Sequence, residues 1–520
     1  MKKQVVSVWI PGDQLLLDHP ALREAEKDYP REDIYVVLIE SRERICQLPY
    51  QRKKIVLLLS AMRHYAERLR VRGYQVELLR SDSFISGLLD HVRRQQPVRL
   101  LTMAASEYDT RQLQQKRLAA ELGVSVAVLP NSQFLIEFYN PIPRPQPGKR
   151  YVMEHFYHAM RRHYGILLDD NGEPTGGQWN YDKLNRQGLP AHLHVPAIPT
   201  FQPDAITRDV IGLVESMDHG VGSARDFDLA VTHEQAQHLL KTFIAERLTD
   251  FGPYEDAMSS QSSSLYHSQL SPYINIGLLD PLDAVQAAEV AYYQHRAPIQ
   301  SVEGFVRQIL GWREFMYWQY WQQMPGLRHA NSWHGHRRMP QMFWDGLTDM
   351  KCVQHIARRV LDTGYSNHIE RLMVICNFCL LSGIDPYEVS NWFLSCYVDA
   401  YDWVVLPNVV GMGMNSDDGY TATKPYIASA NYINKMSDYC NGCRYSCKQR
   451  SGPDACPFNV LYWNFLIEHE QTLRSNPRMG PSVLGLRHLD LQERKEITED
   501  ARQFLSHLAY YPATDSVPGP

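Results

Sequence analysis

The sequence lacks a long apolar run, a strong excess of charge and a glycine-rich phosphate loop. No stretch of its 520 residues is long and apolar enough to span a bilayer. The apolar segment near the N-terminus breaks at Pro11 and Asp13, so no signal peptide is predicted and we expect a cytoplasmic protein. The formal net charge of −5 argues against a protein that coats nucleic acid, although a local basic groove is compatible with it.

Cysteine is scarce, and four of the 9 cysteines lie close together near the C-terminus. Cys440, Cys443, Cys447 and Cys456 are separated by two, three and eight residues, and Pro457 follows the last of them. In a reducing cytosol such clusters bind metal or carry out redox chemistry more often than they form disulfides. Iron–sulfur ligation, a zinc site of four thiolates and unliganded thiols all remain open from the spacing alone.

Residues 1–135 alternate between apolar strands and amphipathic helices. Strands are predicted in QVVSVWI, DIYVVLIE, YQVELL, VRLLTMA and VSVAVLP. This alternation predicts an α/β domain with a doubly wound parallel sheet. Ligands of such sheets bind beyond the carboxyl ends of the strands, which makes PGDQ and ESRE candidate site segments. Because no GxGxxG motif follows the first strand, a standard dinucleotide site is not indicated.

The rest of the chain divides at its prolines. Residues 136–225 contain NPIPRPQPG and GLPAHLHVPAIPTFQPD, which predict an irregular linker between domains. From 226 to 520 the apolar residues recur at helical spacing, as in VEGFVRQILGWREFMYWQYW. We therefore predict an α/β domain, a linker and a large all-α domain.

Several stretches of the helical part resemble photolyases and cryptochromes. HSQLSPYINIGLL (267–279) resembles their segment that wraps the flavin phosphates, and FVRQILGWREFMY (305–317) resembles their Arg-Gln-x4-Arg-Glu-Phe helix. TGYSNHIERLMV (363–374) and YVDAYDWVVLPNVVGM (397–412) are similar to their flavin-facing segments. The cysteine segment resembles the prokaryotic iron–sulfur branch, the bacterial (6-4) photolyases and their cryptochrome relatives. The resemblance covers essentially the whole chain.

The resemblance implies an FAD cofactor in the domain at 226–520. Small polar groups would contact its diphosphate, a pair of Arg371 with Asp399 or Asp402 would face its isoalloxazine ring, and Asn408 would lie near N5. The positions expected to bind FAD are Tyr254, His267, Ser268, Gln269, Leu270, Ser271, Gln308, Arg371, Asp399, Asp402 and Asn408.

The same branch holds a [4Fe–4S] cluster with one upstream cysteine and three in the C-terminal segment. Carried over, the ligands are Cys352, Cys440, Cys443 and Cys456. The spacing alone would have kept Cys447 and left out Cys352. The branch also uses 6,7-dimethyl-8-ribityllumazine as an antenna, for which Asp13, Gln14 and Glu40 in the domain at 1–135 are the candidate contacts.

The implied activity is light-driven repair, in which excited reduced FAD donates an electron to a flipped-out pyrimidine (6-4) lesion. His368 is the expected proton donor, because imidazole titrates near neutrality. The family commonly has two adjacent histidines here, and Asn367 replaces the first; its amide can hydrogen-bond a base but cannot donate a proton at useful pH. Trp392, Trp344 and Tyr401 match positions of an electron relay, although each of them could equally be core packing.

The implied partner is UV-damaged DNA, bound by a monomer that has no membrane segment. The candidate DNA contacts are Lys149, Arg150, Arg161, Arg162, Lys183, Arg186, Lys424 and Tyr426. A blue-light photoreceptor of cryptochrome type is the first alternative, and Asn367 is the feature that favours it. A light-independent iron–sulfur protein that binds nucleic acid is the second, and it predicts a cluster without flavin.

Overall fold

Five parallel strands form the centre of the N-terminal part of the computed structural model, which describes residues 4–146, 148–190, 194–476 and 478–511. Their order across the sheet is β3-β2-β1-β4-β5. The strands are β1 (Val6–Trp9), β2 (Ile34–Ser41), β3 (Gln75–Ser81), β4 (Arg99–Met103) and β5 (Ser125–Leu129). The predicted parallel sheet is confirmed.

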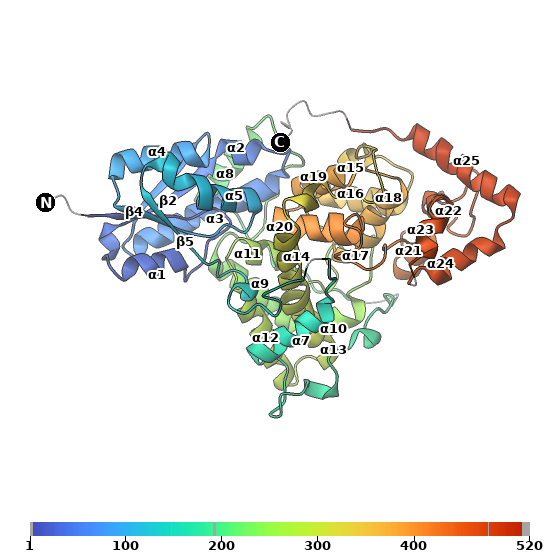
Figure 1. Cartoon of the computed structure of the whole chain (residues 1–520), viewed down its shortest axis with the longest axis horizontal. Coiled ribbons are helices and arrows are strands. Elements are labelled where there is room, and N and C mark those ends of the chain that lie inside the picture. The colour runs from blue at the N-terminus through green and yellow to red at the C-terminus, as the bar shows by residue number, and fades with distance from the viewer. Residues whose placement is uncertain (1–3, 147, 191–193, 477, 512–520) are drawn as a thin grey trace.

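Helices cover both faces of this sheet (Figure 1). In β2, Val36 and Leu38 belong to a core shared with α1 (Pro20–Glu26) and α3 (Arg52–Val71). Val37 and Ile39 point to the opposite face, because successive side chains of a strand alternate. They pack with residues of α4 (Phe84–Gln95) and α6 (Leu118–Leu122). The sheet is therefore doubly wound, and its central strands β1, β2 and β4 are largely buried on both faces.

The region predicted as a linker, 136–225, contains two further helices, α7 (Met153–Tyr164) and α8 (Ala205–Glu215). α8 returns to the α/β part and packs on α3. The predicted domains and linker also contain residues 1–3, 147, 191–193 and 512–520. These lie outside the described residues.

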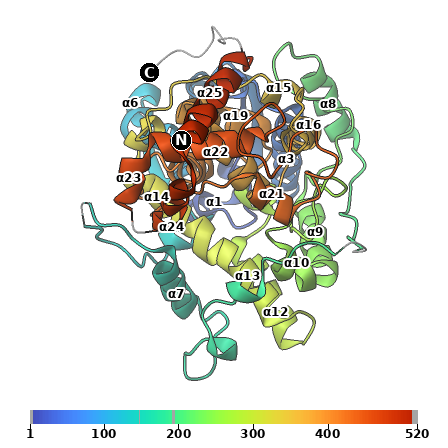
Figure 2. The ribbon, with the colours of Figure 1, turned by 90° about the vertical axis from the view of Figure 1, so that its right-hand side faces the viewer.

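The remaining chain is helical, as predicted. α22 and α25 pack against one another at the end of the molecule farthest from the sheet (Figures 1 and 2). Among the described residues, no helix is long and apolar enough to cross a membrane. The other α-helices are α2 (Arg42–Cys46), α5 (Tyr108–Gln112), α9 (His233–Glu246), α10 (Leu248–Tyr254), α11 (Ser271–Asn275), α12 (Pro281–Tyr293), α13 (Ile299–Val306), α14 (Glu314–Gln323), α15 (Met342–Asp345), α16 (Lys351–Thr363), α17 (His368–Glu370), α18 (Asn377–Leu381), α19 (Pro386–Cys396), α20 (Asp402–Leu406), α21 (Ala430–Met436), α22 (Pro457–Glu468), α23 (Glu470–Arg474), α24 (Gly480–Leu484) and α25 (Leu491–His507).

Four segments have the wider π-helical turn: η2 (Leu113–Arg117), η6 (Arg307–Arg313), η8 (Arg371–Cys376) and η9 (Pro407–Gly413). Each continues an α-helix without a break. Such π-bulges within α-helices are frequent at functional sites. The last three belong to the helical part, and each contributes side chains to the same cavity, described below.

The start of α3 joins the sheet to the helical part directly. The backbone N–H of Gln51 donates to the carbonyl of Ser395 at 2.7 Å. The buried Lys54 ammonium donates to the carbonyls of Leu394 and Ala400, at 2.8 and 2.7 Å. These carbonyls lie in or just beyond α19, so the strand ends of the sheet face the helices.

Candidate functional site

A cavity of about 340 Å³ lies in the helical part, between η6, η8, η9 and the segment that leads into α11. Each π-helical segment contributes a polar side chain to its wall: Gln308 from η6, Arg371 from η8 and Asn408 from η9. The predicted FAD positions that the structure brings together here are His267, Ser268, Gln269, Leu270, Ser271, Gln308, Arg371, Asp399 and Asn408. Tyr254 and Asp402 do not line this cavity.

Arg371 is paired with Asp399 on the cavity wall. Its two terminal nitrogens donate to the two oxygens of Asp399, at 3.0 and 3.1 Å. Ser271 Oγ also donates to this carboxylate, at 2.8 Å. The guanidinium lies 4.1 Å from the ring centroid of Tyr397, so it is stacked as well as paired. Of the two carboxylates considered for Arg371, the structure places Asp399 beside it.

Several polar atoms of the cavity are buried without a partner. They include Nε2 of His267 and two nitrogens of the Arg313 guanidinium, Nε and Nη2. Burial lowers the pKa of His267 to about 3, so this imidazole is neutral. Buried polar atoms normally have partners, and a ligand rich in hydroxyl and phosphate oxygens would supply them here. The donor set therefore fits a flavin dinucleotide.

His368 lines the same cavity, and its side chain is 49 % exposed. Its Nε2 lies 3.4 Å from Oδ1 of Asp256. Its ring lies edge-on to His267, with the centroids 5.6 Å apart. Burial alone would lower the pKa of His368, but the hydrogen bond and charge of Asp256 outweigh it and raise the pKa. The sequence analysis missed Asp256, because no motif links it to a histidine so far along the chain.

Asn367 lies beside His368 but does not line the cavity. Its side chain is buried and caps α17: Oδ1 accepts a hydrogen bond from the backbone N–H of Glu370 at 2.9 Å. Its Nδ2 donates to the carbonyl of Ala257 at 3.2 Å. Both ends of the amide are thus engaged with the backbone, which is the ordinary role of an N-cap asparagine.

The aromatic relay candidates lie in different places. Trp392 is fully buried, with its ring 5.7 Å from Tyr397 and 5.5 Å from Phe343. Trp344, which follows Phe343 in sequence, stacks on Tyr511 at 4.5 Å. Tyr401 lies in another cavity, described below. Tyr397, which the sequence analysis did not single out, touches both Trp392 and Arg371.

Five cysteines line one small cavity, together with Met350, Ala430, Ile433, Tyr439 and Tyr445. Cys352 comes from α16 and joins the C-terminal cysteines, as the resemblance implied; Cys440, Cys443, Cys447 and Cys456 complete the group. Among the described residues, no group of three or more His, Cys, Asp or Glu is arranged to hold a single metal ion. The cavity wall offers thiols and no carboxylate or imidazole, a donor set suited to soft metals and iron–sulfur clusters.

The pair Cys456-Pro457 also has a local structural reason. Cys456 is the N-cap of α22, and Pro457 is its first residue. Proline suits this position because its fixed φ is helical and its missing N–H would be unsatisfied there. The motif therefore places Cys456 at a helix start whether or not a metal is bound.

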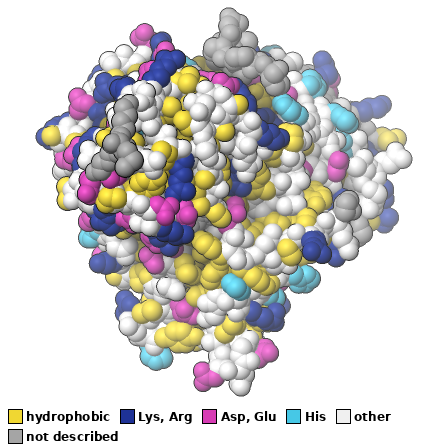
Figure 3. All heavy atoms as spheres, turned by 60° about the vertical axis from the view of Figure 1, so that its left-hand side comes forward, with side chains coloured by type: hydrophobic (Ala, Val, Ile, Leu, Met, Phe, Trp, Pro, Cys, Tyr) yellow, Lys and Arg dark blue, Asp and Glu magenta, His cyan; other side chains and the backbone are white. Residues whose placement is uncertain are grey.

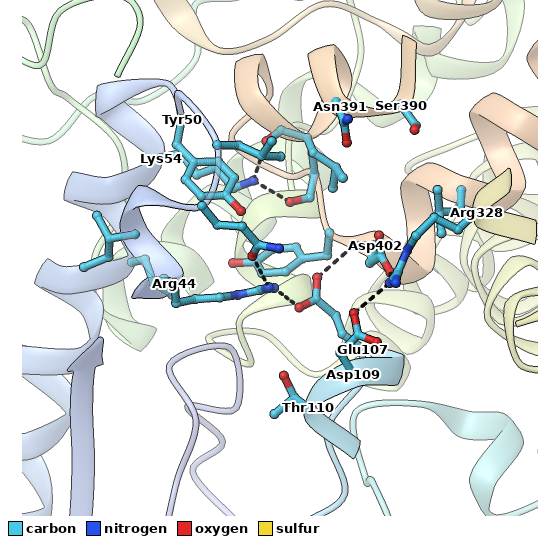
Figure 4. A pocket seen from close by; sticks show the side chains of 18 of the residues that line it. Arg44, Tyr50, Lys54, Glu107, Asp109, Thr110, Arg328, Ser390, Asn391 and Asp402 are labelled. Atoms are coloured by element: carbon cyan, nitrogen blue, oxygen red, sulfur yellow. Dashed lines mark hydrogen bonds and ion pairs between the residues drawn. The ribbon is translucent and has the colours of Figure 1, made fainter. Parts of the chain in front are cut away.

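A second cavity of about 430 Å³ lies at the junction of the sheet with the helices, and we call it the junction cavity. Figure 4 shows Arg44 reaching Glu107, with which it forms an ion pair. Arg328 binds Asp109 and Asp402, each at 2.9 Å. Tyr50, Lys54, Thr110, Ser390, Asn391 and Tyr401 also line it.

The junction cavity contains Tyr401 and Asp402, which the sequence analysis had assigned to the relay and the flavin. The phenol of Tyr320 donates to Asp402 at 3.0 Å, so this carboxylate has partners of its own. The ammonium of Lys54 lies 5.4 Å from the ring centroid of Tyr401. Burial lowers the pKa of Lys54 to about 7.

The predicted antenna residues lie near the strand ends without lining the junction cavity. Asp13 accepts a hydrogen bond from Ser106 Oγ at 2.8 Å, and Gln14 donates to the carbonyl of Ala104 at 2.9 Å. Glu40 is buried between arginine side chains, those of Arg63 and Arg80. The lining residues from the α/β part come from α2, the start of α3 and the segment after β4, and the others come from the helical part, among them Asn391 of α19.

The candidate DNA contacts are corrected at Arg161. This side chain is fully buried, and its guanidinium donates to the backbone carbonyls of Ile166, Leu167 and Trp179. It therefore supports the fold locally and cannot reach a bound nucleic acid. Arg162, one residue later, is exposed and lies over the ring of Trp179 at 4.5 Å.

The other basic candidates remain at the surface or partly exposed. Arg186 lies 3.6 Å from Asp256, next to His368, and also binds Asp182. Lys149, Arg150 and Lys183 are exposed, and Lys424 lies 5.9 Å from the ring of Tyr426. On the face seen in Figure 3, Lys and Arg side chains lie among Asp and Glu side chains.

Comparison with known proteins decides the family. The chain is 41% identical over 512 residues to a (6-4) photolyase of Agrobacterium fabrum, covering 96% of this chain and 99% of that protein. This chain belongs to the photolyase-related family. The family pattern described as "Deoxyribodipyrimidine photo-lyase-related protein" matches residues 8–229. Membership implies FAD binding, and the cavity beside Arg371 and His368 has a donor set that fits it.

Two solved structures share the fold of this photolyase-related protein. A bacterial class III photolyase from Agrobacterium tumefaciens has a TM-score of 0.59, at 17% identity over 84% of this chain and 87% of its own. A cryptochrome from Synechocystis has a TM-score of 0.57, at 15% identity over 84% of this chain and 89% of its own. At these identities the likeness concerns the fold alone.

Proposed function

We propose that this photolyase-related protein is a light-driven (6-4) photolyase. The observation that carries the proposal is one cavity that contains the Arg371–Asp399 pair on its wall and the His368–Asp256 pair beside it. Full-length similarity to a (6-4) photolyase supports the same lesion. When bound, reduced FAD supplies the photoexcited electron, and the chain must then position the lesion and move a proton.

His368 is the proton donor in this proposal. Asp256 accepts from Nε2–H, which holds one proton there and stabilises the doubly protonated ring. The raised pKa extends to higher pH the range in which the ring carries both protons, so that one of them can be given and recovered within one cycle. The half-exposed side chain is accessible to a base extruded from DNA.

The flavin residues have separate duties in this proposal. Arg371 and Asp399 would orient the isoalloxazine ring, and Arg371 would stabilise negative charge on it. Ser268, Gln269 and Ser271 come from the segment before and at the start of α11, and they would contact the diphosphate with backbone and hydroxyl donors. Trp392 and Trp344 would carry electrons to the flavin, and Tyr397 lies between Arg371 and Trp392.

The cysteine cavity would hold a [4Fe–4S] cluster through Cys352, Cys440, Cys443 and Cys456. The wall of thiols and apolar side chains supports a soft, buried group. Cys447 lines the same cavity and would be a bystander.

The junction cavity would hold the antenna, 6,7-dimethyl-8-ribityllumazine. It lies at the carboxyl ends of the strands, where parallel sheets bind ligands. The rings of Tyr50 and Tyr401 offer stacking surfaces, and Arg44 and Glu107 offer a donor and an acceptor for a heterocycle with a hydroxylated chain. Asp13 would act from behind Arg44, whose charge it faces.

Damaged DNA would approach at His368 and Arg186 in this proposal, and the enzyme would be a cytoplasmic monomer. Arg186 is the basic candidate that lies beside the His368–Asp256 pair. The feature that favoured a photoreceptor was Asn367, and its side chain caps α17 outside the cavity. A loss of proton transfer therefore does not follow from this asparagine.

The test is repair of an oligonucleotide that carries one (6-4) photoproduct, measured under blue light and in the dark with the flavin reduced. We expect repair in light only, and its loss in His368→Ala without loss of FAD. General acid–base groups contribute about 10²–10⁴-fold, so the loss should be large. Normal flavin photoreduction without any repair would support the photoreceptor instead.

A further inference from the structure

Glu370, two residues after His368, is tied to the cysteine segment. Its side chain is fully buried, and Oε1 accepts a hydrogen bond from the phenol of Tyr439 at 2.5 Å. Arg359 of α16 donates to both of its oxygens, at 2.9 and 3.0 Å. Tyr439 directly precedes Cys440. The short helix that carries His368 is therefore linked by one hydrogen bond to the residue before a predicted cluster ligand.

Asp256, the partner of His368, is tied to the same segment. Four residues after it, Ser260 donates to Asp438 from both its backbone N–H and its hydroxyl, at 2.8 and 2.7 Å. The backbone N–H of Met258 donates to the carbonyl of Met436 at 2.9 Å. We call residues 436–439 the clamp segment. It contacts the chain near each member of the His368–Asp256 pair: Glu370 close to His368, and Met258 and Ser260 close to Asp256.

We infer that Tyr439 and Asp438 are positioning residues for proton donation by His368, an inference that rests on the proposed function. Neither touches the flavin cavity. Tyr439 fixes α17 through Glu370, and Asp438 fixes the segment that carries Asp256 through Ser260. Together they set the separation of His368 Nε2 and Asp256 Oδ1, which is 3.4 Å.

The hydrogen bond from Tyr439 to Glu370 is strong because its acceptor is a carboxylate and because both side chains are buried away from water. The side chains of Tyr439 and Glu370 are both buried, and the phenol donates to the carboxylate at 2.5 Å. A charge-assisted hydrogen bond in a buried site is stronger than a neutral one at the surface. Removing the hydroxyl would leave an oxygen of Glu370 with one donor fewer and would let α17 shift.

His368 has other charged and titratable neighbours, and they must be kept constant in a test of this inference. The neighbours that face it or its partner are Asp256, Glu255, His267, Arg371, Arg186 and Tyr432. None of them contacts Tyr439 through a hydrogen bond that the structure describes. The hydroxyl of Tyr439 also lies 3.1 Å from the carbonyl of Ser259, three residues after Asp256. A change at Tyr439 therefore reaches the His368–Asp256 pair through the position of α17 and through that of the segment that carries Asp256.

The decisive variant is Tyr439→Phe, which removes the hydroxyl alone, with Asp438→Asn as the second. The matched control is Tyr65→Phe, because Tyr65 is also buried and its phenol makes one hydrogen bond, to the carbonyl of Leu16 at 2.7 Å. Iron and FAD content, repair per absorbed photon as a function of pH, and the pKa of His368 by ¹⁵N NMR are measured on each full-length protein.

We expect Tyr439→Phe and Asp438→Asn to retain iron and FAD, and repair per photon to fall about tenfold because the donor is misplaced. The pKa of His368 should fall as its contact with Asp256 loosens, so the alkaline limb of repair moves to lower pH. Tyr65→Phe should match the wild type in every measurement.

An unchanged pKa of His368 in Tyr439→Phe would overturn the inference. Loss of iron or FAD in both variants would overturn it too, because it would mark a purely structural role. If the wild type repaired no (6-4) lesion, the proposed function would fail, and the NMR measurement would still decide whether the clamp segment positions His368.

Discussion

Arg371 faces Asp399 with two parallel hydrogen bonds, and the next acidic candidate along the chain, Asp402, faces away into the junction cavity. The turn between Tyr397 and the start of α20 separates the two carboxylates, although only two residues lie between them in the sequence. One short segment thus serves both cavities. Under the proposed function, the flavin and the antenna would bind on opposite sides of the same backbone turn.

Asp399→Asn should therefore release FAD, whereas Asp402→Asn should retain it. Breaking the Arg371–Asp399 pair leaves a largely buried guanidinium without its counter-charge, which costs about 3–5 kcal/mol in typical buried pairs. Flavin content after purification and the thermal midpoint with and without added FAD measure the effect. Loss of FAD in Asp402→Asn, with Asp399→Asn unaffected, would reverse the assignment.

Repair should depend on pH through the His368–Asp256 pair. The pKa of His368 is raised above its ordinary value of 6.5, so the charged ring persists to higher pH and repair should decline only as pH rises through the raised value. The stability that the pair contributes has the same sign: it is complete below pH 6.5 and is lost as pH rises through the folded pKa.

Asp256→Asn tests this assignment directly. Removing the carboxylate removes what raises the pKa of His368, so the alkaline limb of the repair profile should move to lower pH. The flavin should stay bound, because Asp256 does not line its cavity. An unmoved alkaline limb in this variant would show that another group limits repair.

The cysteines differ in what their loss should do. Cys352→Ser should yield protein without iron, because Cys352 is the proposed ligand from α16 and lines the cavity together with the C-terminal cysteines. Cys447→Ser should keep iron and its broad visible absorbance. Iron, zinc and sulfide analysis of both proteins distinguishes a cluster from a zinc site. Iron loss on changing Cys447, but not Cys352, would favour the simple spacing rule over the resemblance.

Trp392→Phe should slow flavin photoreduction without lowering repair by a flavin that is reduced beforehand. The indole is fully buried and donates to the carbonyl of Phe343 at 3.2 Å, so phenylalanine loses one hydrogen bond and little volume. Illumination of the oxidised protein in the presence of an external reductant measures the rate of flavin photoreduction. Trp463→Phe is the control, since Trp463 lies beneath Arg450 rather than beside Tyr397. Equal rates in all three proteins would remove Trp392 from the relay.

The sheet was predictable because both faces of its central strands are buried. In DIYVVLIE, the residues from Val36 to Ile39 alternate between the two cores, so the middle of the strand is apolar and is easily distinguished from the amphipathic helices. The residues proposed to bind flavin were singled out for another reason, their resemblance to known segments. The π-helical segments place Gln308, Arg371 and Asn408 on the cavity wall, and the spacing of apolar residues in the sequence does not reveal such segments.

Other residues could not be predicted because their roles arise from tertiary contacts. Asp256 and Tyr439 acquire meaning only when distant segments meet at α17. Arg161 lies in a basic stretch that favoured a DNA contact. Its guanidinium is instead buried and donates to the backbone carbonyls of Ile166 and Leu167. The junction cavity likewise combines Lys54 with Asn391, which lie on separate parts of the fold.

Filling the junction cavity tests the antenna independently of repair. Asn391 lies on α19 and is half-buried in the cavity wall, so Asn391→Trp should occupy the space of a bound chromophore (Figure 4). We expect this variant to lose the lumazine absorbance and the part of the action spectrum that it contributes. Light absorbed by the flavin itself should repair as well as in the wild type, because the flavin cavity does not include Asn391. An unchanged lumazine content would place the antenna elsewhere, and equal losses at all wavelengths would show that the substitution disturbed the flavin.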